Sequence, residues 1–309
     1  MHIYEKNRSC PEVIRTAFFL NPQLKISSFK LDQQILMKKV AIQGFSGCFH
    51  EEAARKFYWD EDLRMVECDS FDQLFEAMDL GRADSAVMAI ENSISGGLLP
   101  NFELLRKSKT TIKGEIYLRI VQNLMALPGQ NIEDIKEVRS HYMAINQTRE
   151  FFKSHPNIQL VESEDTAKSA AEIAREKLEG VGAIGSACAA ELYGLKILQP
   201  SIETVKQNFT RFLILDDAIE VAEPDIDKAS LCFTLPHTPG SLAHILAILS
   251  FYDMNLTRIQ SLPIPGKEWQ YFFYADIKFE SYDRYKQAMS AVRPMMSDLQ
   301  VLGEYKSGL

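Results

Sequence analysis

Between residue 38 and about residue 217, short apolar runs alternate with longer amphipathic stretches. The runs have the length of buried strands, and they lie at residues 40–43, 65–68, 85–90, 137–139, 159–161, 182–185 and 211–215. The stretches between them gather apolar residues on one helix face, and helices are expected at residues 52–59, 71–80, 144–154 and 167–178. Strands and helices that alternate in this way are typical of a doubly wound α/β architecture.

The pattern changes after an acidic segment, residues 216–227, which contains Pro224. The remaining positions predict the order β-α-β-β-α-β, with strands at residues 229–235, 256–262, 269–279 and 299–305 and helices at residues 241–252 and 282–295. This is the order of a ferredoxin-like domain. We therefore expect two separate cores, one in residues 37–217 and one in residues 228–309, joined by a linker of residues 218–227.

Residues 1–36 precede the first expected strand. Their few apolar residues are too interrupted for the hydrophobic region of a secretory signal. We interpret this segment as an N-terminal extension outside the fold, with Met37 as the functional start. The alternative is a short helix that docks on the domain.

The composition excludes several classes of protein. No apolar run approaches the ~20 residues that cross a bilayer, and a net charge of −8 disfavours the basic surface that binds nucleic acid. The five cysteines contain no C-x-x-C pair, and the six histidines have no metal-ligand spacing. We therefore expect reduced thiols in the cytoplasm, no metal site, and neither a membrane nor nucleic acid as partner.

Small polar residues follow most of the expected strands. In open α/β sheets the ligand binds beyond the carboxyl ends of the strands. A single residue of this kind is read as a helix cap, but several together indicate a polar cleft that holds an anionic substrate through neutral donors. The residues at these positions are Gly44, Ser46, Gly47, Glu91, Asn92, Ser93, Ser140, His141, Ser163, Thr166, Ser186 and residues 208–212.

Three groups of these residues resemble the signature motifs of prephenate dehydratases, in the order that the family has. The groups are Glu91-Asn92-Ser93 with Gly96, Ser140-His141 with Gln147, and Thr210-Arg211-Phe212. Residues 228–306 resemble the ACT domain that follows the catalytic domain in this family. The departures lie in loops: Phe45 stands where the family has proline, and Tyr142-Met143 stands where it has proline and glutamine.

The resemblance implies a catalytic domain of two α/β lobes, like a periplasmic binding protein, followed by a ferredoxin-like βαββαβ ACT domain. It implies the decarboxylating dehydration of prephenate to phenylpyruvate in phenylalanine biosynthesis. The aromatic ring that forms supplies the driving force, so no electron sink and no cofactor are expected.

The resemblance also assigns roles to residues. Thr210 is expected to donate a hydrogen bond or proton to the leaving hydroxyl. Glu91 has two possible roles. It is either the alternative proton donor, because a dianionic substrate should raise its pKa, or a solvated loop carboxylate. Arg211 either clamps a substrate carboxylate or pairs with an acidic neighbour, and His141 either donates to substrate or caps a helix. The other expected substrate contacts are Asn92, Ser93, Ser140, Gln147, Thr166 and Phe212.

The ACT resemblance implies phenylalanine as effector, bound between the ACT domains of a homodimer or homotetramer. The expected effector contacts are Gly240, Ser241, Leu242, Asn255, Leu256, Thr257, Gln260 and Ser261. The family's sensing segment reads Glu-Ser-Arg-Pro, whereas this chain has Gln260-Ser261-Leu262-Pro263. Because both charges are missing, we expect inhibition to persist in a weaker form.

Two other functions stay open at this point. An arogenate dehydratase performs the same elimination on the aminated substrate. A non-catalytic regulatory protein would use both domains to bind metabolites without chemistry.

Overall fold

The computed structural model describes residues 37–308, and the expectations for residues 1–36 lie outside this range. The first lobe has five strands in the order β2-β1-β3-β11-β5. β1 pairs in parallel with β2 and β3, whereas β11 is antiparallel to both β3 and β5. The bounds are β1 Lys38–Gln43, β2 Leu63–Cys68, β3 Ser85–Asn92, β5 Ile112–Arg119 and β11 Phe209–Leu215, with the short β4 Gly96–Gly97 beside β3.

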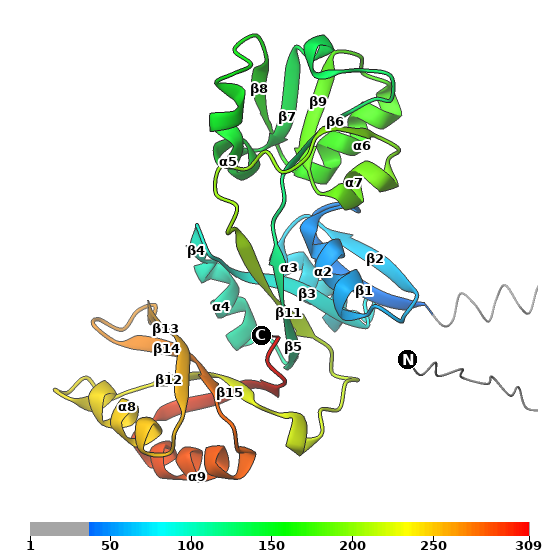
Figure 1. Ribbon diagram of the computed structural model, residues 1–309. Coiled ribbons are helices and arrows are strands. Elements are labelled where there is room, and N and C mark those ends of the chain that lie inside the picture. Colours follow the sequence, from blue (N-terminus) through cyan, green and yellow to red (C-terminus); the bar gives the residue numbers. More distant parts are fainter. Residues whose placement is uncertain (1–36, 309) are drawn as a thin grey trace, which may run out of the picture. The chain divides into compact units, whose positions relative to one another are not determined.

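Helices cover both faces of this sheet because successive residues of a strand point to opposite sides. Val40 and Ile42 of β1 pack with α2 (Phe49–Phe57), whereas Ala41 packs with α3 (Phe71–Asp79) and α4 (Leu99–Lys107). The first lobe is thus a three-layer α/β unit (Figure 1).

The second lobe has a five-stranded sheet in the order β10-β6-β9-β7-β8. The chain enters it after β5 and leaves it before β11, so two segments connect the lobes (Figure 1). The bounds are β6 Asn123–Ala126, β7 Glu137–His141, β8 Gln159–Ser163, β9 Val181–Gly185, β10 Lys196–Gln199, α5 Tyr142–Phe152, α6 Thr166–Glu176 and α7 Ala187–Leu192. The expected two-lobed α/β fold is confirmed.

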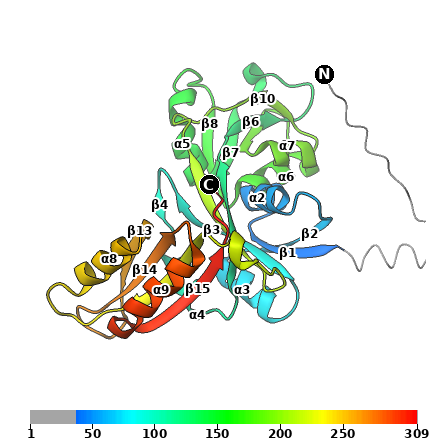
Figure 2. The ribbon, with the colours of Figure 1, turned by 60° about the horizontal axis from the view of Figure 1, so that its bottom comes forward.

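The C-terminal part has the expected β-α-β-β-α-β order, and its strands lie in the ferredoxin-like sequence β13-β14-β12-β15. α8 and α9 lie on one face of this sheet and share a core with it (Figure 2). The bounds are β12 Lys228–Thr234, α8 Ser241–Phe251, β13 Asn255–Pro263, β14 Tyr271–Lys278, α9 Tyr282–Val292 and β15 Ser297–Tyr305.

The expectation of two fully separate cores is wrong, because one hydrophobic cluster includes residues of both the first lobe and the C-terminal part. β15 pairs in parallel with β5 through Gly303 and Ile112, which makes the C-terminal sheet continuous with that of the first lobe. A Cβ at Gly303 would stand 2.3 Å from the Ile112 carbonyl oxygen, so this close approach requires glycine. One hydrophobic cluster contains both Leu213 of β11 and Tyr274 of β14. The two parts are therefore packed into one body along this junction.

Several elements escaped the sequence pattern. The expected strands of the catalytic part all recur within two residues of their predicted bounds, and the longer β11 and β7 include Thr210 and His141. β5, β6, β10, α4 and α7 were not expected. β5 carries Lys113, Gly114 and Glu115 in succession, which hides its strand character in the sequence.

Candidate active site

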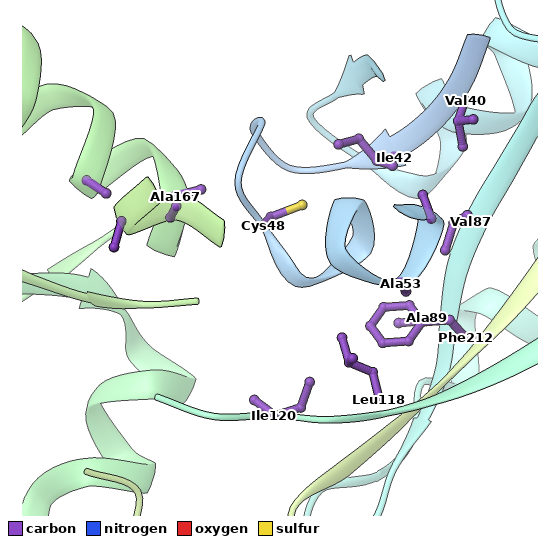
Figure 3. Close-up of a cluster of buried hydrophobic side chains, with 14 of the residues drawn as sticks. Val40, Ile42, Cys48, Ala53, Val87, Ala89, Leu118, Ile120, Ala167 and Phe212 are labelled. Carbon is purple, nitrogen blue, oxygen red and sulfur yellow. The ribbon is translucent and has the colours of Figure 1, made fainter. Parts of the chain in front are cut away.

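A cavity of about 400 Å³ lies between the two lobes and is lined from both. Its lining includes Thr210 of β11, Asn92 of β3 and Gln147 of α5. Ala89 and Phe212 line it as well and belong to the buried apolar cluster drawn in Figure 3. The cavity lining thus combines apolar side chains with polar ones, as is typical of sites for small organic molecules.

Asn92 fixes the hydroxyl of Thr210. Its Nδ2 donates to Thr210 Oγ1 at 3.0 Å and to Asn208 Oδ1 at 2.7 Å, while its Oδ1 accepts from the backbone N–H groups of Ile94 and Ser95. Because Thr210 Oγ1 accepts from Asn92, its own proton is left to donate into the cavity. The pair lies at one register position of β3 and β11, where Thr210 faces Asn92.

The network continues into the second lobe through Asn208, which the sequence analysis named among the strand-end residues without a role, and through Gln122, which it did not name. Asn208 Nδ2 donates to Gln147 Oε1 at 3.0 Å, and Gln122 Nε2 donates to the same oxygen at 3.2 Å. Asn208 stood next to the Thr210 motif, which was a usable signal. Gln122 lies between two strands that were not expected, so the sequence gave no context for it.

Glu91 and Arg211 are adjacent to Asn92 and Thr210 but do not line the cavity. Adjacent strand residues face opposite sides of a sheet, so these two side chains point toward the C-terminal domain. Glu91 Oε2 forms an ion pair with Arg258 Nη1 of β13 at 2.5 Å. The expected proton-donor role of Glu91 therefore does not fit the structure.

Arg211 is buried among partners on that same side. Its Nε donates to Glu115 at 2.7 Å, its Nη1 pairs with Asp276, and its Nη2 donates to the Tyr305 hydroxyl at 2.9 Å. The expected clamp on a substrate carboxylate is contradicted, and the structural pairing that the sequence left open is what the chain forms.

The two expected substrate-binding serines, Ser93 and Ser140, form hydrogen bonds with backbone groups. Ser93 Oγ donates to the Gln207 carbonyl and accepts from the Phe209 N–H, and Ser140 is fully buried with its Oγ donating to the Ile184 carbonyl at 2.7 Å. Neither lines the cavity. Ser93 holds the segment before β11 against the end of β3, and Ser140 holds β7 against β9.

The remaining expected contacts do line the cavity: His141, Gln147, Thr166 and Phe212. His141 caps α5, since its Nδ1 accepts from the Met143 N–H at 3.4 Å, and burial lowers its pKa. The two roles left open for His141, cap and cavity residue, therefore coexist.

Charge in the cavity comes from carboxylates. Glu164 and Asp165 line it, and no lysine or arginine among the residues that the structure describes does so. Asp165 caps α6 by accepting from the N–H groups of Ala167 and Lys168, and burial raises its pKa. A bound anion would have to rest on neutral donors.

The expected effector residues fall into two groups. Gly240, at φ 86°, precedes α8, and Ser241 and Leu242 line a pocket of about 130 Å³ together with Trp269 and Tyr271. The other group, residues 255–257, lies at the opposite end of β13, where Asn255 faces Lys278. Gln260 and Ser261 stand between these ends. One chain therefore does not bring the two groups together.

Within residues 37–308, no group of histidine, cysteine, aspartate or glutamate side chains is arranged to hold a metal ion. The helices in that range are too short or too polar to cross a membrane.

Comparisons with known proteins agree with this geometry. The family model described as prephenate dehydratase matches residues 40–219. The chain is 36% identical to arogenate dehydratase 2 of Petunia hybrida over 289 residues, which cover 87% of this chain and 72% of the relative.

Two solved structures are similar over most of the chain. Prephenate dehydratase from Arthrobacter aurescens, solved with L-Phe, has a TM-score of 0.77 at 27% identity and covers 87% of this chain and 90% of its own. A quorum-quenching acylase, GqqA, has a TM-score of 0.78 at 27% identity and covers 87% and 98%. Together with the family model, which spans more than half of the sequence, these similarities show that the chain belongs to the prephenate dehydratase family.

Proposed function

We propose that the chain converts prephenate to phenylpyruvate with loss of carbon dioxide and water. The observation that carries this proposal is the Thr210 hydroxyl, whose oxygen accepts from Asn92 Nδ2 and whose proton is free for a substrate in the cavity. A hydrogen bond to the departing oxygen stabilises the negative charge that develops on this oxygen in the transition state.

In this reaction the bond between the ring and its carboxylate breaks, and its electron pair enters the ring. The bond between the opposite ring carbon and the hydroxyl breaks at the same time, and the hydroxyl leaves as water after gaining one proton from solvent. Thr210 is too weak an acid to give up its proton outright, so we assign it the hydrogen bond that stabilises the departing oxygen.

Arogenate is the second candidate substrate, and a specific feature favours it. Arogenate carries an ammonium group where prephenate has a keto oxygen, and the cavity is lined by Glu164 and Asp165 without lysine or arginine among the described residues. An ammonium group pairs favourably with such carboxylates. The name of the Petunia hybrida relative points the same way.

The deciding experiment incubates purified protein with prephenate and, separately, with arogenate. Phenylpyruvate is followed by its absorbance in alkali and phenylalanine by chromatography, and kcat/KM is compared between the substrates. Turnover of prephenate supports the first proposal, and turnover of arogenate alone supports the second. If neither is turned over by folded protein, the non-catalytic binding role takes its place.

We also propose that phenylalanine regulates the enzyme through the C-terminal domain. β13 is the edge strand of its sheet, so two copies of the chain can pair there and bring the pocket near Gly240 of one to residues 255–257 of the other. The Arthrobacter relative was solved with L-Phe. Binding is expected to be weak, because Gln260 and Leu262 lack the charges of the family's motif.

A further inference from the structure

His50 lines the cavity and belongs to none of the roles assigned above. It is the second residue of α2, and its ring packs edge to face against Phe212, with 5.0 Å between ring centroids. Phe71 lies against it at 5.6 Å. Two aromatic rings therefore hold the imidazole in one orientation at the cavity wall.

One ring nitrogen of His50 accepts a hydrogen bond from a backbone N–H group of β3 that lies beyond the pairing with β1. β1 pairs with β3 only as far as Val87, so the N–H of Ala89 has no strand acceptor on that side. His50 Nε2 accepts from this N–H at 3.3 Å. The bond ties α2 to the strand that carries Asn92 three residues further on.

The other ring nitrogen is a donor. Burial lowers the pKa of His50 to about 4, so the ring is neutral near pH 7. Because Nε2 accepts a hydrogen bond, the single ring proton must be on Nδ1. No residue in the described part of the chain forms a hydrogen bond with Nδ1. A donor at a cavity wall without a protein partner is available to a ligand.

The position of His50 relative to Thr210 suggests which atom it meets. Its ring contacts Phe212, which lies two residues beyond Thr210 on the same strand face, roughly 7 Å away. In prephenate and arogenate alike, the ring carboxylate is attached to the carbon opposite the one that bears the hydroxyl. When the substrate's hydroxyl is at Thr210 and its ring lies along this strand face, its ring carboxylate is directed toward His50.

We propose that His50 Nδ1–H donates a hydrogen bond to the ring carboxylate of the substrate, which makes His50 a substrate-binding residue of this enzyme. The contact rests on the proposed function. A neutral donor suits a carboxylate that must lose its charge as carbon dioxide departs, because a cation would stabilise the ground state more than the transition state.

Two substitutions separate this role from the structural one. In His50→Gln the side-chain oxygen replaces Nε2 and still accepts from Ala89, while nothing stands at the Nδ1 position. In His50→Asn the amide nitrogen stands near the Nδ1 position and can donate, while the Ala89 N–H loses its acceptor. His155→Gln is the matched control, because His155 does not line the cavity.

We expect His50→Gln to keep the wild-type Tm and to lose roughly 10- to 100-fold in kcat/KM, mainly through KM. The loss should be equal for prephenate and arogenate, since both carry the ring carboxylate. In His50→Asn the Tm should fall, because the Ala89 N–H loses its acceptor, and kcat/KM should fall less than in the glutamine variant.

The opposite order, with His50→Gln as active as wild type and His50→Asn impaired, would show that His50 only holds β3. A loss confined to one of the two substrates would also overturn the assignment. Absence of turnover in the wild type is a different result, since it refutes the proposed function itself and this contact with it.

Discussion

Thr210 and Arg211 are neighbours in the chain with opposite surroundings. Thr210 is directed at the cavity and bonded to Asn92, whereas Arg211 is enclosed by Glu115, Asp276 and Tyr305. The same alternation separates Asn92 from Glu91 on β3. Each motif therefore contributes one residue to the cavity and one to the junction with the C-terminal domain.

Thr210→Val tests the hydroxyl directly. We expect kcat to fall by roughly 10²-fold or more, because valine keeps the shape but removes the hydrogen bond to the departing oxygen, with Tm unchanged. Steady-state kinetics and thermal unfolding measure both. Thr234→Val is the matched control, since Thr234 is also a buried strand threonine, 7% exposed against 8% for Thr210. Near-normal turnover in Thr210→Val would remove Thr210 from the mechanism.

Among the elements, β3 and β11 connect the cavity with the C-terminal domain. Their cavity faces carry Asn92 and Thr210, and their opposite faces are tied to β13 and β14 through Arg258 and Asp276. A shift of the C-terminal sheet would act on the same two strands that carry Asn92 and Thr210 at the cavity. This arrangement supplies a physical connection for the proposed regulation.

Glu91→Gln tests the element that joins the domains. The Arg258 side chain is 9% exposed, and its Nε has no hydrogen-bond partner within residues 37–308, so removing the carboxylate charge leaves a buried guanidinium poorly compensated. We expect the free energy of unfolding to fall by about 1–3 kcal/mol, as measured by urea denaturation.

The pH profile of kcat/KM in this variant should match the wild type, because Glu91 does not line the cavity. If one limb of the pH profile disappeared in this variant, the result would instead support Glu91 as the proton donor. Glu103→Gln serves as control, since the Glu103–Arg106 pair at 2.8 Å lies within one partly exposed helix and is expected to contribute under about 1 kcal/mol.

For the whole molecule, the continuous sheet links the C-terminal domain to the strands that line the cavity. Leu262 stands where the family's sensing segment has arginine, and it packs against the hydrophobic cluster that both domains share. At this position the chain therefore has apolar packing at the junction in place of a charge.

Calorimetric titration with phenylalanine tests the regulatory proposal. We expect binding that is detectable at millimolar ligand and inhibition in the assay, with substrate weakening phenylalanine binding by the same factor. Gly240→Ala should reduce binding, because Gly240 has φ 86° and a Cβ there would meet His244 at 3.3 Å. Gly266→Ala, at φ 76° with open space around it, controls for backbone strain alone. Absence of heat with wild-type protein would leave the C-terminal domain as an oligomerisation module.

The sequence by itself determined the alternation of strands and helices in the catalytic part and the β-α-β-β-α-β order of the C-terminal part, because periodicity is a property of neighbouring residues. The two lobes and the roles of Thr210 and Asn92 were implied by the resemblance to prephenate dehydratases. The structure has the two lobes and both residues line the cavity, while their roles stay a proposal. Residues 1–36 lie outside the described structure, so the expectation for them stays a prediction.

Only the tertiary structure decided which face each motif residue occupies and which distant residues complete the site. β5 shows the physical reason: Glu115 is a buried strand residue only because Arg211 and Lys228, 96 and 113 positions away, neutralise its charge. His50, Gln122 and Asn208 likewise gain their roles from partners on other elements. Alternation along a strand is visible in a sequence, but the sheet's neighbours decide which side becomes the cavity and which becomes the junction.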